Sequence, residues 1–73
     1  MTWTTQRCDV PHGTRIEIFD RMPDGRGWSH KVGKVHYHGE ALHMAKNDCE
    51  FIDIVPAPPM PVGPETRQVW RKV

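Results

Sequence analysis

The sequence predicts a small, mainly β domain, built as an antiparallel sheet of three or four strands or as an open SH3-like barrel. Residues 14–19 alternate polar and apolar side chains, which is the pattern of a half-buried strand. Turn-forming residues at 22–27 separate this stretch from a second apolar one. The only run of good helix formers, 40–46, is short for an isolated helix.

The first half of the chain reads as an arm followed by two strands. Residues 1–13 are predicted to be an irregular N-terminal arm, because a Pro-His-Gly break precedes any periodic pattern. In the first strand, Ile16 and Ile18 should face the core. Residues 28–38 read as the second strand, and its apolar periodicity slips at Gly33, where we expect a β-bulge.

The segment 40–46 fits either a short helix or one arm of a hairpin, and we favour the hairpin. With 38–41 as the turn, the hairpin pairs Val35 with Met44, His36 with His43, and Tyr37 with Leu42. Residues 49–55 read as the last strand. We expect its apolar residues to supply core: Phe51, Ile52, Ile54 and Val55.

A proline-rich stretch at 56–64 divides the chain, because proline donates no backbone hydrogen bond and fixes φ. The expected organisation is an arm over 1–13, a β domain over 14–55, and a proline-rich linker with a basic, disordered tail over 56–73. We interpret the prolines as a stiff spacer. The alternative is a polyproline ligand, since Pro58 and Pro61 are three positions apart.

Composition argues against several classes of protein. Ten Lys and Arg against nine Asp and Glu give a net charge of +1, not the strong positive field of a protein that binds phosphate backbones. No apolar run approaches a membrane span, and the N-terminus lacks the features of a signal peptide, so we expect a cytoplasmic protein. In the cytoplasm, Cys8 and Cys49 should be free thiols.

We expect no enzyme activity, no cofactor and no metal. No phosphate-binding glycine loop is present, and so short a chain has little room for a shielded catalytic cleft. Histidines are frequent, and three of them could ligate Zn²⁺ or Cu²⁺: His36, His38 and His43. We favour a solvated histidine face, with a pH-sensitive or partner-facing patch as the other alternative.

Two groups of residues are candidates for binding a protein partner. The first is a strand face with the basic residues Arg15, Lys31 and Lys34, together with His36 and His43. The second lies in the tail and consists of Arg67, Trp70 and Arg71. Trp70 could instead fold back over the domain, and a basic aromatic tail could stack on nucleic acid, which is the main rival function.

The whole chain resembles the small host-RNA-polymerase-binding transcription regulators of lytic Xanthomonas bacteriophage. The resemblance rests on the length of 73 residues, the opening Met1-Thr2-Trp3-Thr4-Thr5, and a β core followed by a proline-rich basic tail. It implies a monomer in the host cytoplasm that binds core subunits of bacterial RNA polymerase, inhibits initiation by interfering with the σ factor, and promotes antitermination. It assigns no binding residues, because no motif aligns, and it implies no direct nucleic-acid binding.

Overall fold

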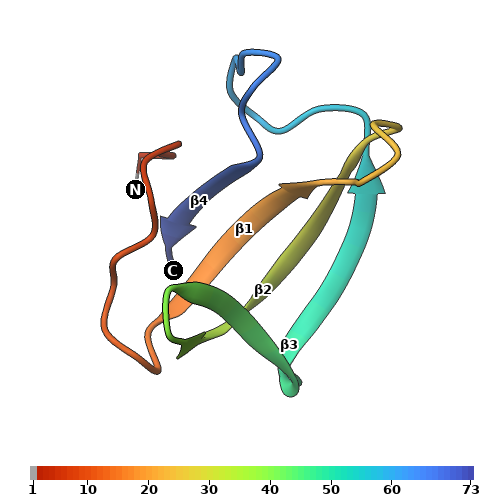
Figure 1. The fold of residues 1–73 in the computed structure, drawn as a ribbon. Coiled ribbons are helices and arrows are strands. Elements are labelled where there is room, and N and C mark those ends of the chain that lie inside the picture. The colour runs from red at the N-terminus through yellow and green to blue at the C-terminus, as the bar shows by residue number, and fades with distance from the viewer. Residues whose placement is uncertain (1) are drawn as a thin grey trace.

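Four antiparallel strands form one open sheet (Figure 1). The structure is a computed structural model that describes residues 2–73. The strands are β1 (Arg15–Arg21), β2 (Trp28–His38), β3 (Ala41–Val55) and β4 (Gln68–Lys72), and their order in the sheet is β3-β2-β1-β4. Residues 2–73 contain no helix, so the predicted mainly β class is confirmed.

The β2–β3 hairpin has the register that the sequence predicts. Val35 pairs with Met44, His36 with His43, and Tyr37 with Leu42. Gly39 occupies the turn with a φ of 61°, a conformation that side chains disfavour. The short-helix alternative for 40–46 is wrong because Leu42 and Met44 on a strand can both pack against the core cluster. The register also shifts between Gly33 and Val35, as the expected bulge requires.

The C-terminal residues belong to the sheet, in place of the disordered tail that the sequence predicts. β4 pairs antiparallel with the free edge of β1, where Trp70 lies opposite Ile18 and Val69 opposite Phe19. Val69 is fully buried and Trp70 is 6% exposed. The physical reason is that β1 carries apolar residues on both faces, and its second edge has unpaired backbone N–H and C=O groups. A further strand covers the apolar residues and pairs these groups.

The core consists of two clusters that lie on opposite faces of the sheet, because neighbouring residues of a strand point to opposite sides. Ile16 and Ile18 belong to the first cluster, and Phe19 to the second. The first cluster also contains Cys8, Val10, Val35 and Trp70. The second contains Trp28 and Val69, with Trp3, Val55, Met60 and Val62 packed against it.

The N-terminal arm and the proline-rich segment are therefore packed parts of the fold. The arm has no regular strand, but Thr4 forms an isolated bridge with Trp70 and the side chain of Cys8 is buried. Met60 lies against the second cluster, so 56–64 covers a sheet face instead of acting as a free spacer. Cys8 and Cys49 are free thiols, as expected. Within residues 2–73, no helix has the length and hydrophobicity needed to cross a membrane.

Candidate functional site

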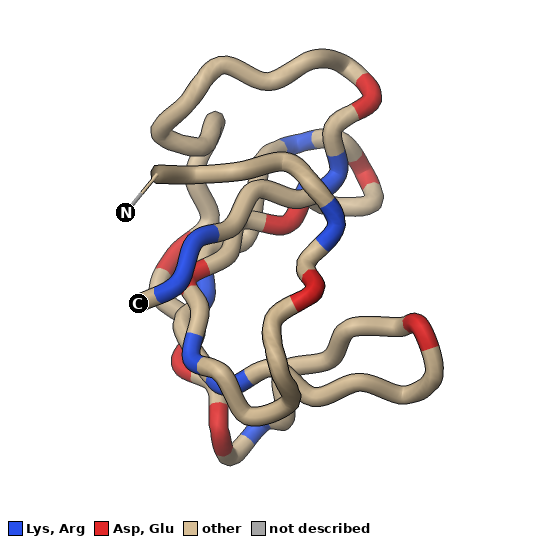
Figure 2. Tube along the Cα trace, turned by 90° about the vertical axis from the view of Figure 1, so that its left-hand side faces the viewer, with Lys and Arg blue, Asp and Glu red and all other residues tan. Residues whose placement is uncertain are grey.

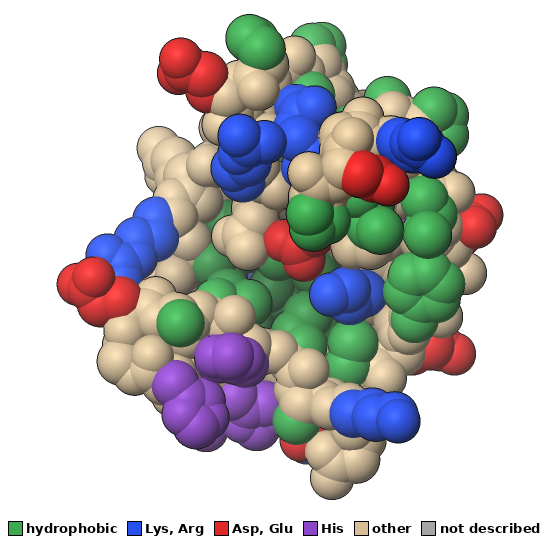
Figure 3. All heavy atoms as spheres, turned by 45° about the vertical axis from the view of Figure 1, so that its right-hand side comes forward, with side chains coloured by type: hydrophobic (Ala, Val, Ile, Leu, Met, Phe, Trp, Pro, Cys, Tyr) green, Lys and Arg blue, Asp and Glu red, His purple; other side chains and the backbone are tan. Residues whose placement is uncertain are grey.

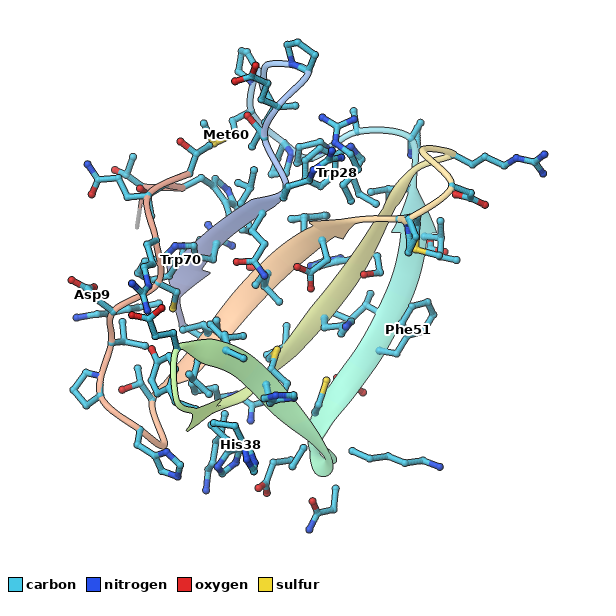
Figure 4. All side chains as sticks on the ribbon, in the orientation of Figure 1. Asp9, Trp28, His38, Phe51, Met60 and Trp70 are labelled. Atoms are coloured by element: carbon cyan, nitrogen blue, oxygen red, sulfur yellow. The ribbon has the colours of Figure 1, made fainter. Side chains whose placement is uncertain are left out.

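The second half of β3 exposes three large hydrophobic side chains, which we call the β3 apolar surface. Phe51 is 56% exposed, Ile52 46% and Ile54 51%. The prediction that these residues supply core is wrong, and of that group Val55 alone packs against a buried cluster. These side chains lie along β3, the outermost strand at one edge of the sheet. Phe51 therefore lies at the opposite edge of the sheet from Trp70 (Figure 4).

A β-bulge explains why Phe51 and Ile54 act together. Phe51 lies opposite Lys31 and Ile54 opposite Ser29, while Ile52 has no partner in β2. Lys31 and Ser29 are two positions apart, so they point to the same face. The extra residue therefore puts Phe51 and Ile54 on one face, although three positions would place them on opposite faces of a regular strand.

This face is the one that carries the first core cluster. Ile18 lies opposite Lys31 in the sheet, so Phe51, Lys31 and Ile18 follow one another across it. The N-terminal arm and the first half of β3 cover the cluster around Ile16 and Val35. Hydrophobic side chains remain visible on this side of the molecule, around a hollow (Figure 3). The β3 apolar surface thus continues the core outward, beyond the segments that cover it.

The acidic side chains of β3 lie on the face opposite Phe51 and Ile54, because Glu50 pairs with Val32 and Asp53 with His30. Residues 47–55 contain no Lys or Arg, and the side chains of Glu50 and Asp53 are exposed. Lys31 is the neighbouring cation, and its Nζ lies 3.7 Å from a carboxylate oxygen of Asp20. Asp53 Oδ1 also accepts a hydrogen bond of 2.7 Å from the backbone N–H of Ile54. The face that exposes Phe51 and Ile54 therefore carries Lys31 beside them, while Glu50 and Asp53 belong to the other face.

The predicted basic face is only partly assembled. Arg15 and Lys34 are register partners on β1 and β2, and both are exposed. They line a shallow depression of about 430 Å³ together with Asp48 and Glu50. Lys31 lies elsewhere, in its ion pair with Asp20. Basic and acidic residues are interspersed along the chain trace (Figure 2).

The two predicted histidines face each other across the β2–β3 hairpin and belong to a surface group of imidazoles. The Nδ1 of His36 lies 3.2 Å from Nε2 of His12, and its Nε2 lies 3.1 Å from Asp48. His43 meets His38 edge to face, with ring centroids 5.0 Å apart. Histidine side chains gather at one end of the molecule (Figure 3). Among residues 2–73, no set of three His, Cys, Asp or Glu is grouped to hold a metal ion.

The predicted tail residues do not form an exposed anchor. The indole of Trp70 is buried, so the fold-back alternative describes this residue. Arg71 donates to the Glu17 carboxylate at 2.8 and 2.9 Å and lies 4.4 Å from the centre of the Trp3 ring. Arg67 is exposed and lines an open groove of about 620 Å³ between the arm and the start of β4.

Glu17 is a half-buried carboxylate between the imidazole of His30 and the guanidinium of Arg71, on the face of the second cluster. His30 and Arg71 both hydrogen-bond to it. Burial acts to raise the pKa of Glu17, but these hydrogen bonds and the nearby positive charge outweigh burial and hold it below its usual range. The Arg71 side chain is thus held by Glu17 within the fold.

Sequence reasoning missed the β3 apolar surface because alternation says which residues share a face, not which part of that face is covered. The structure joins the predicted hairpin arm and the predicted last strand into one strand, Ala41–Val55. This strand is longer than β1 and β2, so part of it extends beyond the covering segments. Comparisons with protein-family models, with curated proteins and with solved structures found no match.

Proposed function

We propose that this chain is a protein-binding transcription regulator encoded by a bacteriophage. Its partner is the core of bacterial RNA polymerase in the host cytoplasm, where it inhibits initiation by interfering with the σ factor and promotes antitermination. The partner and these two effects come from the resemblance of the whole chain to phage regulators. Binding to a protein is supported by one structural observation: the β3 apolar surface is exposed in a chain that buries both Trp28 and Trp70.

The state of the basic residues favours a protein partner over nucleic acid. Lys31 faces Asp20, Arg71 is bound to Glu17, and Arg21 donates to the backbone carbonyls of Gly63 and Thr66. Contacts to phosphate require cations that are free to replace counterions. These three side chains already have partners in the fold, while Arg15, Lys34 and Arg67 are exposed, so the case against nucleic acid rests mainly on the net charge of +1.

The proposed mechanism needs no chemistry. A bound domain that occupies polymerase surface used by the σ factor shifts the enzyme away from initiation-competent states, because it binds only the states in which that surface is free. The size of the shift is limited by the difference in affinity between the two states. The same occupancy on an elongating polymerase would favour read-through by the same differential binding.

The test uses purified core polymerase and the full chain. We expect the immobilised protein to retain core polymerase, to compete with σ factor for it, and to leave random DNA and RNA unshifted in low salt. Transcription from a σ-dependent promoter should fall when the protein is added before σ factor. Failure to retain polymerase, or a shift of nucleic acid that weakens steeply with salt, would overturn the proposal.

A further inference from the structure

We propose that His12 and His36 form a binding site for a divalent transition-metal ion, such as Zn²⁺ or Cu²⁺, where the N-terminal arm meets β2. The ligand atoms are Nε2 of His12 and Nδ1 of His36, and Asp48 orients the second ring. This inference goes beyond the proposed function and does not depend on it.

The two ring nitrogens are separated by the distance that two ligands of one ion have. Nδ1 of His36 lies 3.2 Å from Nε2 of His12. Imidazole nitrogens bind Zn²⁺ at about 2.0–2.1 Å, so two of them on one ion are about 2.9 Å apart at a right angle and about 3.3 Å apart at the tetrahedral angle. The observed distance lies between these values, so one ion can contact both nitrogens with little movement of the rings.

The other nitrogen of His36 has the partner that metal-binding histidines usually have. Its Nε2–H donates to a carboxylate oxygen of Asp48 at 3.1 Å. This hydrogen bond places the proton on Nε2 and leaves the lone pair of Nδ1 for an ion. Histidine ligands commonly donate their second N–H to a carboxylate, which fixes the orientation of the ring and raises its basicity. Asp48 therefore acts on the site through His36.

The fold brings these residues together from three segments. His12 belongs to the arm, which is held beside β2 by a hydrogen bond of 2.8 Å from the Gly13 N–H to the Val35 carbonyl. His36 lies on β2 and Asp48 on β3. His12 is exposed and the His36 side chain is 28% accessible, so an ion can reach both nitrogens from solvent.

The site differs from the set of ligands that the sequence suggested. That set joins His36 to His38 and His43, but the last two rings meet edge to face with centroids 5.0 Å apart. No hydrogen bond between their ring nitrogens is present in residues 2–73, whereas His12 and His36 have one. The arm, which sequence reasoning left out, supplies the second ligand.

Two protein ligands leave positions on the ion for water. Residues 2–73 contain no group of three His, Cys, Asp or Glu that could hold an ion, so we expect weaker binding than in structural zinc sites with four protein ligands. Imidazole suits Zn²⁺, Cu²⁺ and Ni²⁺, and Cu²⁺ binds most tightly in this series.

Nearby charges do not exclude a cation. Arg15 and Lys34 line the depression beside Asp48, but Glu50 lines it as well. Two cations thus face two carboxylates in this part of the surface.

The test follows Zn²⁺ binding to the full chain by calorimetry and by the imidazole resonances of the labelled protein. His12→Ala and His36→Ala each remove one ligand from the surface, so the fold should be retained. Asp48→Asn keeps an acceptor for the His36 N–H but removes its charge. His38→Ala/His43→Ala is the matched control, because it removes the other contacting pair of imidazoles.

We expect one Zn²⁺ per chain, with the largest shifts at His12 and His36. Each single alanine variant should weaken binding by at least about tenfold, Asp48→Asn by about tenfold or more, and the control should bind as wild type does. The thermal unfolding midpoint should rise with Zn²⁺ in wild type and stay unchanged in His12→Ala, because an ion that binds the folded chain stabilises it.

Three results would overturn the inference: no response of wild type to Zn²⁺, equal affinity of wild type and His12→Ala, or loss of binding in the control pair. The first would show that His12 and His36 share a hydrogen bond and nothing more. The last would place the ion on the hairpin. Since polymerase takes no part in these measurements, the proposed function is judged separately.

Discussion

The indole Nε1–H of Trp70 donates a hydrogen bond of 2.7 Å to the backbone carbonyl of Gln6, sixty-four positions away. The Trp70 backbone also exchanges two hydrogen bonds with Thr4, of 2.9 and 3.0 Å. Trp70 thus links the last strand to the N-terminal arm by three hydrogen bonds, and its ring lies in the first core cluster. A tryptophan that the sequence offers as a binding anchor is a structural residue.

Replacing Trp70 with a smaller residue should destabilise the fold, and alanine should cost more than phenylalanine. Trp70→Phe keeps most of the apolar area but leaves the Gln6 carbonyl without its donor, and should cost about 1–2 kcal/mol. Trp70→Ala should cost about 3–5 kcal/mol, which is comparable with the whole stability of a small domain. Urea unfolding measures both. Val73→Ser should stay within about 0.5 kcal/mol of wild type, and a Trp70→Phe variant as stable as that control would contradict the role of the hydrogen bond.

Glu17 should make the fold sensitive to acid. Its folded pKa lies below the ordinary value of 4.5, so the stability it contributes is present above that value and is lost as pH falls through the lowered folded pKa. Glu17→Gln should lower the free energy of unfolding at neutral pH by about 1–2 kcal/mol. It should also reduce the loss of stability that follows when the pH falls. Thermal unfolding midpoints between neutral and acid pH provide the measurement. Glu65→Gln, at an exposed position, is the control and should keep the wild-type slope.

Gly33 should not tolerate alanine, because β3 passes directly over it. A Cβ at this position would lie 2.8 Å from the Cα of Cys49 and closer still to the carbonyl oxygen of Asp48. Both are backbone atoms, so the strands must separate, and Gly33→Ala should cost about 1–3 kcal/mol or more. Gly63→Ala is the matched control, since its nearest neighbour is 3.9 Å away. Equal stability of the two variants in urea would show that the bulge opens freely.

Tyr37→Phe should loosen the N-terminal arm. The phenol donates a hydrogen bond of 2.8 Å to the Val10 carbonyl and lies 3.3 Å from that of Cys8. Its loss should cost about 1–2 kcal/mol and speed amide exchange of the arm. Burial, and then the hydrogen bond to Cys8, raise the pKa of Tyr37 above 10.0, so wild type should also lose stability as pH rises beyond that value. If the Tyr37→Phe variant loses stability at alkaline pH as much as wild type does, ionisation of Tyr37 is not the cause of that loss.

The parts of the fold that sequence could predict are the local ones. The pairing of Tyr37 with Leu42 follows from alternation and a short turn, both of which lie within a few residues. The pairing of β4 with β1 could not be predicted in the same way, because nothing near Val69 indicates which distant edge it will satisfy. The exposure of Phe51 was missed for a related reason. The periodic pattern identifies an apolar face but does not say where its cover ends.

The strand order also determines how the sheet can assemble. β1 and β2 are joined by a short turn. The other edge of β1 pairs with β4, whose Lys72 lies opposite Ile16, fifty-six positions earlier in the chain. Closing so long a loop is entropically slow compared with forming a hairpin. During refolding, an early three-stranded species should therefore expose Ile18 and Phe19 on an unprotected edge. Aggregation in dilute denaturant, relieved by lower protein concentration, would be the practical sign of that delay.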